Sequence, residues 1–282
     1  MSEDNLKVLG EFYRRKRESL LPESMGLPKS ARRSRTPGLR REDVAYLAGV
    51  SSVWYSKIER GKTKGISATT IELLNSALQL TKDEVEYVNR LIASENIACP
   101  VSPCMRLSPY SQRILDLVNP LPAMVLNDYL DIIYANSAFV KMCGVDVNEL
   151  SVQERNYIHL TITSSKWRKF LNITDEQSLS VLFERLAGVM RSNQASRYTD
   201  KKMRDLIERF LLSSTLFHDA WKKNTVHKPQ LDHEICHASL KKKMKFFKQI
   251  LFHGSGESSG RITIYHPVDD SDYERLERIL NK

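Results

Sequence analysis

The chain has 282 residues, 41% of them hydrophobic and 27% charged, which is enough apolar material for two globular domains. Its formal net charge of +9 at pH 7 favours a polyanionic partner. The sequence has no run of about 18 apolar residues and no signal-peptide pattern, which excludes a membrane-spanning helix, so we expect a cytoplasmic protein without a membrane partner.

The positive charge is concentrated near the N-terminus. Residues 1–66 hold 15 Lys and Arg against 8 Asp and Glu, and this surplus of 7 leaves a net charge of only 2 for the other 216 residues. We therefore expect a polyanion to bind the N-terminal part of the chain.

A first helix is predicted from Asn5 to Leu20, because Leu6, Leu9 and Tyr13 recur at helical spacing. Three prolines interrupt the basic connection that follows it. This connection either contacts DNA phosphates and the minor groove or is a solvated loop, and its candidate side chains are Arg32, Arg33 and Arg35.

A helix-turn-helix pattern extends from Arg40 to Gly61. Gly49 can adopt the positive backbone φ angle of a sharp turn, and Ser51 can cap the helix that follows. Both predicted helices have apolar faces and can therefore pack at a steep angle; these faces are Val44, Ala45 and Ala48 in the first, and Val50, Tyr55 and Ile58 around the second.

The opposite face of the second helix is left for DNA. It carries Ser52, Val53, Ser56 and Lys57, and short polar and cationic side chains at such positions read base edges in the major groove. An ordinary helical hairpin with a solvated face is the alternative. Trp54 either stacks on the DNA backbone or packs between helices, and we favour packing because tryptophan usually buries most of its ring.

Two further helices follow the motif. Ser67 can cap a helix with the apolar stripe Ile71, Leu74 and Leu78, and Thr81 with Glu84 forms a capping box for the next helix. The first domain is therefore expected to contain five helices.

Prolines and a change of pattern mark the domain boundary. We expect a helix-turn-helix domain at residues 1–95, a linker at residues 96–107 and a ligand-binding and dimerisation domain at residues 108–282. Strands are predicted at both ends of the second domain. One hairpin turns at Asn127-Asp128, and the glycine-rich HGSGESSG joins KMKFFKQILF to RITIYHP in the other.

Helices fill the region between these hairpins and the C-terminus. Their periodic apolar residues are preceded by capping side chains. The predicted caps are Ser108 before Pro109, Thr174 with Gln177, Ser214, and Ser271 with Glu274.

The segment TPGLRREDVAYLAGVSSVWYSKIERG resembles the signature of MmyB-like regulators, helix-turn-helix proteins of the lambda-repressor-like XRE class. The C-terminal resemblance rests on IIYANSAF, QERNYIHL, FHDAWKKNTV and the closing hairpin. It implies the fold class α + α/β, with a five-helix lambda-repressor-like domain followed by a PAS-like α+β domain built on an antiparallel sheet.

The resemblance also implies a transcription regulator that binds a double-stranded DNA operator as a homodimer. It implies that Arg41 holds a phosphate and that Ser52, Val53 and Lys57 face bases. The complete set of DNA-binding candidates is Arg40, Arg41, Ser51, Ser52, Val53, Trp54, Ser56, Lys57 and Arg60.

A small lipophilic effector, of the fatty-acid type seen in a relative, is implied for the second domain. An apolar cavity needs only a few polar groups to orient such a ligand, and an arginine suits a carboxylate. The candidates are Tyr134, Asn136, Arg155, Asn156, Trp167 and Trp221. As alternatives, the two tryptophans are plain core and Asn136 is a helix cap.

Two other classes of function are alternatives to a ligand-sensing regulator. The stretch His233-Glu234-Ile235-Cys236-His237 matches the H-E-x-x-H pattern of zinc hydrolases, but that chemistry needs a helix and a third ligand, whereas a strand-like run follows it here. We therefore expect no catalytic residue, no metal and no cofactor. The second alternative is a DNA-binding adaptor whose C-terminal domain dimerises without a ligand.

Overall fold

The computed structural model describes residues 3–27, 38–63, 65–93, 102–103, 106–195, 197, 200–227, 230–237, 243–254 and 258–281. The chain forms two compact units, residues 1–98 with 194–199 and residues 99–193 with 200–282. The three arginines predicted to contact DNA from the basic connection lie outside the described residues. No helix in the described ranges is long and apolar enough to cross a membrane.

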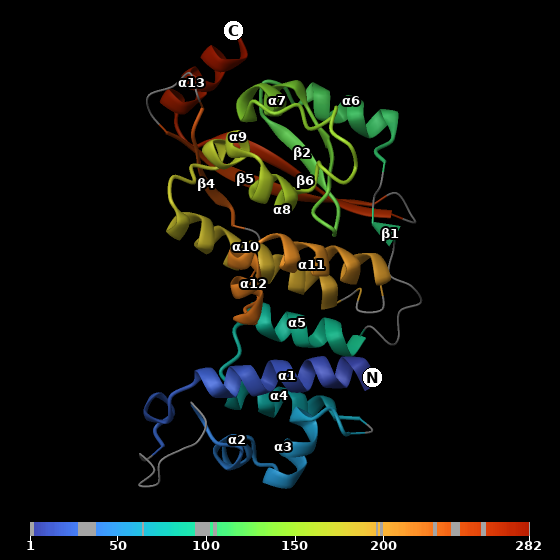
Figure 1. The fold of residues 1–282 in the computed structure, drawn as a ribbon, viewed down its shortest axis with the longest axis vertical. Coiled ribbons are helices and arrows are strands. Elements are labelled where there is room, and N and C mark those ends of the chain that lie inside the picture. Colours follow the sequence, from blue (N-terminus) through green and yellow to red (C-terminus); the bar gives the residue numbers. More distant parts are fainter. Residues whose placement is uncertain are drawn as a thin grey trace. The chain divides into compact units, whose positions relative to one another are not determined.

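The first unit is helical (Figure 1). Its elements are α1 (Glu3–Ser19), the 3₁₀ turn η1 (Pro22–Met25), α2 (Arg41–Ala48), α3 (Ser52–Glu59), α4 (Ala68–Ala77) and α5 (Lys82–Ala93). The stripe predicted for the first helix is buried, and the ring centroids of Phe12 and Tyr87 lie 5.0 Å apart, joining α1 to α5.

Two local features fix the packing of this unit. Gly10 lets α1 approach the end of α3, because a Cβ at this position would lie 2.5 Å from the carbonyl oxygens of Ile58 and Glu59. The predicted caps of α4 and α5 are confirmed: Ser67 accepts from the Thr70 N–H at 3.2 Å, and Thr81 and Glu84 form a reciprocal capping box.

The second unit is built on an antiparallel sheet with the strand order β3-β2-β6-β5-β4. Both predicted hairpins are present. The strands are β2 (Ala123–Leu126), β3 (Ile132–Ala135), β4 (Asp232–Ile235), β5 (Met244–Gly254) and β6 (Ser258–Pro267). The short β1 (Ser102–Pro103), which falls within the predicted linker, pairs in parallel with β6.

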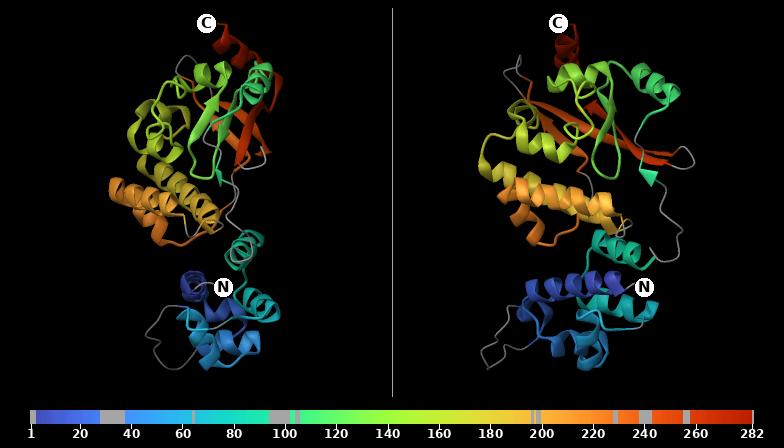
Figure 2. Two further views of the ribbon diagram at one scale, coloured as in Figure 1. Left: turned by 90° about the vertical axis from the view of Figure 1, so that its right-hand side faces the viewer. Right: turned by 45° about the vertical axis from the view of Figure 1, so that its right-hand side comes forward.

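Alternation along the strands separates two cores, since successive side chains point to opposite faces of a sheet. The main core contains Met124, Ile132 and Tyr265 and lies on the face covered by the helices between residues 137 and 280. Their neighbours Val125 and Ile133 pack on the other face with the helix of residues 109–117 (Figure 2). Each face of this part of the sheet is therefore apolar.

The helices of this unit are α6 (Pro109–Leu117), α7 (Ser137–Cys143), α8 (Tyr157–Thr163), α9 (Ser165–Phe170), α10 (Glu176–Ala195), α11 (Lys201–Ser213), α12 (Thr215–Lys222) and α13 (Asp270–Leu280). Their start sites confirm two of the predicted caps, because Ser108 and Ser214 each accept a backbone N–H at the first turn of α6 and α12. Asn136 caps α7 in the same way, as the alternative to its ligand-binding role expects.

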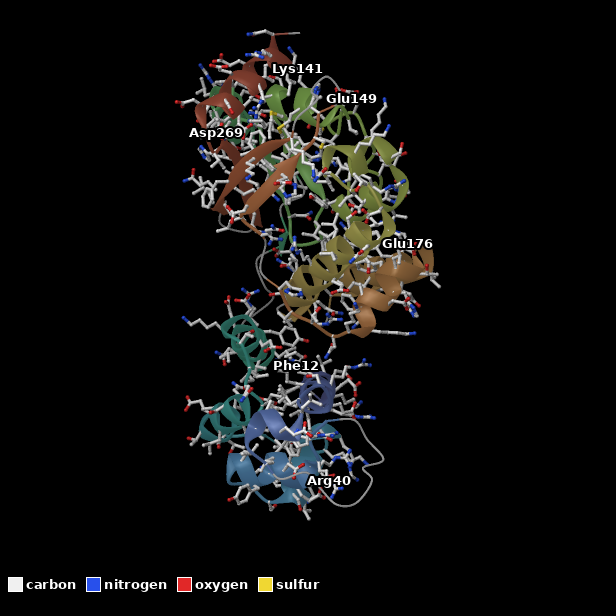
Figure 3. All side chains as sticks on the ribbon, turned by 90° about the vertical axis from the view of Figure 1, so that its left-hand side faces the viewer. Phe12, Arg40, Lys141, Glu149, Glu176 and Asp269 are labelled. Carbon is white, nitrogen blue, oxygen red and sulfur yellow. The ribbon has the colours of Figure 1, made fainter. Side chains whose placement is uncertain are left out.

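Two predicted caps are wrong. The helix α10 is capped by Asp175, whose carboxylate accepts the Ser178 N–H at 2.7 Å, while the Thr174 hydroxyl donates to Asp175. The helix α13 is capped by Asp269, which accepts the Asp272 N–H at 2.9 Å (Figure 3). In both cases a carboxylate one or two residues away takes the position that we assigned to a hydroxyl, because an ionised acceptor bonds more strongly to the helix N-terminus.

Candidate functional sites

The turn between α2 and α3 has the geometry predicted for a helix-turn-helix. Gly49 has a φ angle of +64°, and the Val50 N–H reaches back to the Ala45 carbonyl at 2.9 Å. Ser51 accepts the Trp54 N–H at 3.1 Å and so caps α3. These bonds satisfy backbone groups at both helix ends and fix the direction of α3 relative to α2.

A shallow hollow follows the exposed side of α3. It is lined by Arg41, Glu42, Ser52, Val53, Ser56, Lys57 and Arg60. The Val53 side chain is 66% exposed, and Arg60 donates to the Ser56 hydroxyl at 2.6 Å. The face therefore combines cationic, hydroxyl and methyl groups, which are the groups that contact phosphates and base edges.

A buried ion-pair network lies beneath one edge of this hollow. The Glu59 carboxylate contacts Arg17 at 2.6 Å and Arg41 at 2.6 Å, and Arg17 also donates to the Leu39 carbonyl at 2.8 Å. Burial alone would raise the pKa of Glu59, but hydrogen bonds from the two arginines hold it below its ordinary value. The carboxylate is therefore ionised at neutral pH and fixes Arg41, whose side chain is 41% exposed.

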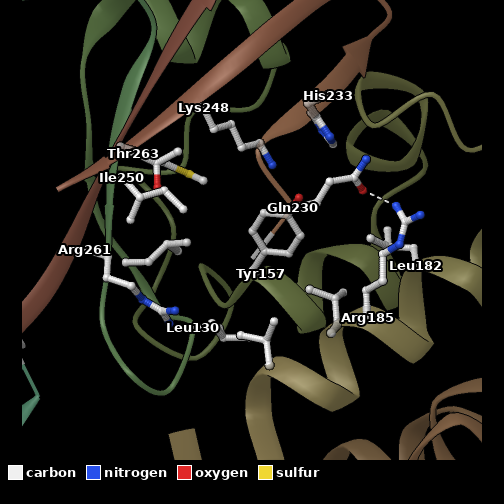
Figure 4. Close-up of a pocket in the computed structure, with 14 residues that line it drawn as sticks. Leu130, Tyr157, Leu182, Arg185, Gln230, His233, Lys248, Ile250, Arg261 and Thr263 are labelled. Carbon is white, nitrogen blue, oxygen red and sulfur yellow. Dashed lines mark hydrogen bonds between the residues drawn. The ribbon is translucent and has the colours of Figure 1, made fainter. Parts of the chain in front are cut away.

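The second unit contains a pocket between its sheet and α10 (Figure 4). The pocket encloses about 100 Å³. The residues at its wall are Met124, Leu126, Leu130, Tyr157, Leu182, Arg185, Leu186, Val189, Gln230, His233, Lys248, Ile250, Arg261 and Thr263. The four residues from α10 have the spacing i, i+3, i+4 and i+7, so one face of this helix forms one wall.

One end of the pocket is cationic. Arg185 donates a hydrogen bond to the Gln230 side chain at the mouth, and Lys248 and His233 extend into the pocket from β5 and β4 (Figure 4). Burial and the nearby Arg185 lower the pKa of Lys248 from 10.5 to about 8. Burial, Lys248 and Arg185 hold the pKa of His233 well below 6.5, so this ring is neutral at pH 7.

Comparison with known families identifies both units. A model of the MmyB-like transcription regulator ligand binding domain matches residues 107–279, and a helix-turn-helix domain model matches residues 9–88. The chain belongs to the MmyB-like transcription regulators. No curated protein matches the chain.

In this MmyB-like regulator the nine DNA-binding candidates occupy one end of the first unit but play different parts. The structure brings Arg41, Ser52, Val53, Ser56, Lys57 and Arg60 together around the hollow. Ser51 caps α3 and Trp54 is half-buried. Arg40 stands at the start of α2, where its backbone N–H donates to Asp43 at 2.7 Å (Figure 3).

The six ligand-binding candidates lie outside the wall of the pocket. Two of them are structural: the Asn136 amide makes four hydrogen bonds with backbone groups, and the Asn156 amide makes three with backbone groups and one with Asp131. An amide has two donors and two acceptor lone pairs, so neither has capacity for a ligand. The Tyr134 ring packs against the core on the α6 side, and its hydroxyl donates to the exposed carboxylate of Asp116.

The other three candidates are also placed elsewhere. Trp167 is fully buried in the main core beside Phe139, as the plain-core alternative expects. Trp221 packs on Phe217 and lies 4.2 Å beneath the guanidinium of Arg191. The Arg155 carbonyl accepts from the Ile132 N–H, just before α8 begins. We therefore base the candidate site on the pocket residues instead.

The H-E-x-x-H stretch is not helical: its first three residues lie on β4, and Cys236 and His237 follow the end of this strand. His233 faces the pocket, whereas the Glu234 side chain is 48% exposed and lies 3.7 Å from Lys243. A helix would place the two histidines one turn apart on one face, whereas here β4 ends at Ile235, before His237. Within the described ranges no group of three His, Cys, Asp or Glu side chains could hold a metal.

Sequence reasoning missed Lys248, Arg185 and Arg261, although a signal was present. In β5 the inward positions are Met244, Phe246, Lys248 and Ile250, so a lysine interrupts an apolar alternation. Polar residues at core-facing positions of a strand mark functional sites or bulges. The glycine-rich turn predicts the hairpin but does not show which face of the sheet is turned toward the helices.

Proposed function

We propose that this MmyB-like regulator binds operator DNA through α3 as a homodimer and changes its DNA affinity when a small lipophilic molecule occupies the pocket. The helix-turn-helix domain and the ligand-binding domain make it a DNA-binding transcription regulator with a ligand-binding domain. The observation that carries the proposal is the hollow on α3, where Val53, Lys57 and Ser52 are presented beside Arg41.

In the proposed complex Lys57, Ser52 and Val53 contact base edges while Arg41 holds a phosphate. Glu59 supports this role, because it fixes the Arg41 guanidinium at the edge of the hollow without removing it from solvent. Two symmetric half-sites one helical turn apart are the arrangement that this motif class reads, which supports the homodimer.

The proposed effector is fatty-acid-like, and the domain PAS-like. The antiparallel sheet, with most of the helices of this unit over one face, supports the PAS-like description. Leu126, Leu130, Leu186, Val189 and Ile250 form an apolar wall, which supports a lipophilic ligand. The enclosed space is about 100 Å³, below the roughly 150 Å³ cavity that holds benzene, so a long chain requires the pocket to widen.

The DNA-binding part is tested with an operator selected from a random duplex library by the full-length protein. We expect Lys57→Ala and Ser52→Ala each to weaken binding to that operator by about 1 to 3 kcal/mol, the scale of one specific contact. The matched control is Lys82→Ala, at the exposed start of α5, which removes the same charge away from the hollow. Equal affinities for Lys57→Ala, Lys82→Ala and wild type would show that α3 is not the reading helix.

The sensing part is tested by native mass spectrometry of the purified protein and by measuring operator affinity before and after delipidation. A co-purifying amphiphile and a changed affinity are expected. A protein without adduct, whose operator affinity is indifferent to added octanoate and octanol, would support the adaptor that dimerises without a ligand.

A further inference from the structure

The pocket brings cationic side chains together in a largely apolar wall. Its described wall contains Arg185, Lys248 and Arg261 together with His233, and no Asp or Glu. Neither Arg185 nor Lys248 forms an ion pair with any carboxylate in the described part of the chain, and the buried Nε2 of His233 has no hydrogen-bond partner there. A charged site in an apolar wall is unfavourable unless something compensates it.

The lowered pKa of Lys248 is consistent with a cation that has no carboxylate beside it. Burial and then the nearby charge of Arg185 lower the pKa of the Lys248 ammonium to about 8, although the Tyr265 ring centroid lies 5.4 Å from it. Burial of a lysine beside a second cation disfavours the charged form, whereas an anion in the same space favours it. Perturbed groups of this kind, in a concave site, are typical of ligand-binding positions.

We propose that Arg185, Lys248 and His233 bind the anionic head group of the effector, a carboxylate, and that its apolar chain points inward along α10. The inference rests on the proposed ligand-binding function of this pocket. Arg185 supplies a planar pair of donors, Lys248 supplies the ammonium, and neutral His233 donates from Nε2.

The position of the mouth determines this orientation. A surface groove shares Leu182, Arg185, Gln230 and His233 with the pocket, so the hydrogen bond between Arg185 and Gln230 stands where the two meet. The outer groove also contains Asp175 and Glu234, which repel an anion. A carboxylate is therefore retained at the mouth beside Arg185, and the chain lies against the leucine, valine and isoleucine side chains of the wall.

Binding of a carboxylate is coupled to protonation of Lys248. The groups that face it are Arg185 from α10, His233 from β4, Tyr157 from α8, and Arg261 and Tyr265 from β6, none of which is acidic at pH 7. With a pKa of about 8, the free lysine is about 90% charged at pH 7 and about 10% charged at pH 9. Because the anion binds the charged form, its affinity falls as pH rises, by up to about tenfold over this range.

The test compares octanoate with 1-octanol by isothermal titration of the full-length protein. These probes differ in the head group and share the chain. We expect the wild type to bind octanoate at least tenfold more tightly than octanol at pH 7, and to take up about half a proton per octanoate at pH 8. Proton uptake is measured in buffers of different ionisation enthalpy.

Two variants and one control assign the effect to residues. Lys248→Met and Arg185→Gln should each weaken octanoate binding by about 10- to 100-fold, the scale of a hydrogen bond to a charged group, and leave octanol binding unchanged. Lys248→Met should also raise the unfolding temperature of the ligand-free protein by a few degrees, since it removes an uncompensated charge. The control is Lys245→Met, on the outward face of the same strand, which should change neither octanoate binding nor the unfolding temperature.

The outcomes distinguish the head-group assignment from the more general proposal that the pocket binds a ligand. If octanol binds as tightly as octanoate, or if neither variant reduces the preference, the head-group assignment is wrong while the pocket stands. If neither probe binds the wild type, the proposed pocket and this inference fall together. Should Lys248→Met fail to fold, Arg185→Gln at the exposed mouth decides the question alone.

Discussion

The first unit holds the guanidinium of Arg17 against the carboxylate of Glu59, with side chains 3% and 1% exposed, whereas the pocket of the second unit holds Lys248 without any carboxylate among the described residues. Both are charged groups withdrawn from water. The first has its counter-charge supplied by the chain, and the second does not.

This difference distinguishes a buried charge that stabilises the fold from a buried charge that is available to a ligand. Removing a partner from a neutralised network damages the fold, because it leaves an unpaired charge in place. A buried cation without a counter-charge instead lowers the free energy of unfolding of the ligand-free protein. Binding of an anion beside it raises that free energy again. Burial alone does not identify a binding site, but burial without a partner does point to one.

The largest expected effect is that of Glu59→Ala, which turns the neutralised network into an uncompensated one. We expect a loss of about 3 to 5 kcal/mol from the first unit, since Arg17 and Arg41 lose their common partner. Hydrogen exchange of peptides from α1 and α3 in the full chain measures it. The control Glu42→Ala removes an exposed carboxylate from α2 and should stay within about 0.5 kcal/mol. Equal exchange in both variants would mean that the network is not stabilising.

A smaller effect is expected for Asn136→Ala, a polar group whose partners are all supplied by the chain. It should destabilise the second unit by about 2 to 3 kcal/mol, because buried backbone groups near β2 and α7 lose their partners. Denaturant unfolding gives the stability and titration gives the affinity for octanoate. A large loss of octanoate affinity with an unchanged free energy of unfolding would show that Asn136 contacts the ligand.

The smallest effect should come from Gln230→Glu, which supplies the missing counter-charge at the mouth. A carboxylate beside Arg185 and near Lys248 should stabilise the ligand-free protein by about 1 kcal/mol and weaken octanoate binding by competition. Thermal unfolding and titration are compared with Gln249→Glu, which adds the same charge on the outward face of β5. Destabilisation by Gln230→Glu alone would contradict the uncompensated-charge description.

Much of the fold could be predicted because its turns and helix caps are formed by residues that are close together in the sequence. The turn at Gly49, the cap at Ser51 and the capping box at Thr81 depend on residues within four positions of one another. The errors at Thr174 and Ser271 arose where a nearby aspartate competed for the same backbone N–H, a contest that spacing does not resolve.

The pocket could not be predicted in the same way because its wall is assembled from distant segments. Arg185, His233 and Lys248 lie on one helix and two strands and meet only through the sheet register, in which His233 pairs with Phe246. Asn136 and Asn156 attracted attention as polar residues among apolar ones, yet their partners are backbone groups that no residue pattern reveals.

The contact at Gly10 has a genetic consequence. Any side chain there would collide with the backbone at the end of α3, so missense alleles at this codon should abolish operator binding while leaving residues 107–279 folded and able to bind their ligand. Such alleles separate the two activities within one polypeptide. In a screen for deregulated expression they would map to α1, far in sequence from the codons of α3, the helix that we propose contacts DNA.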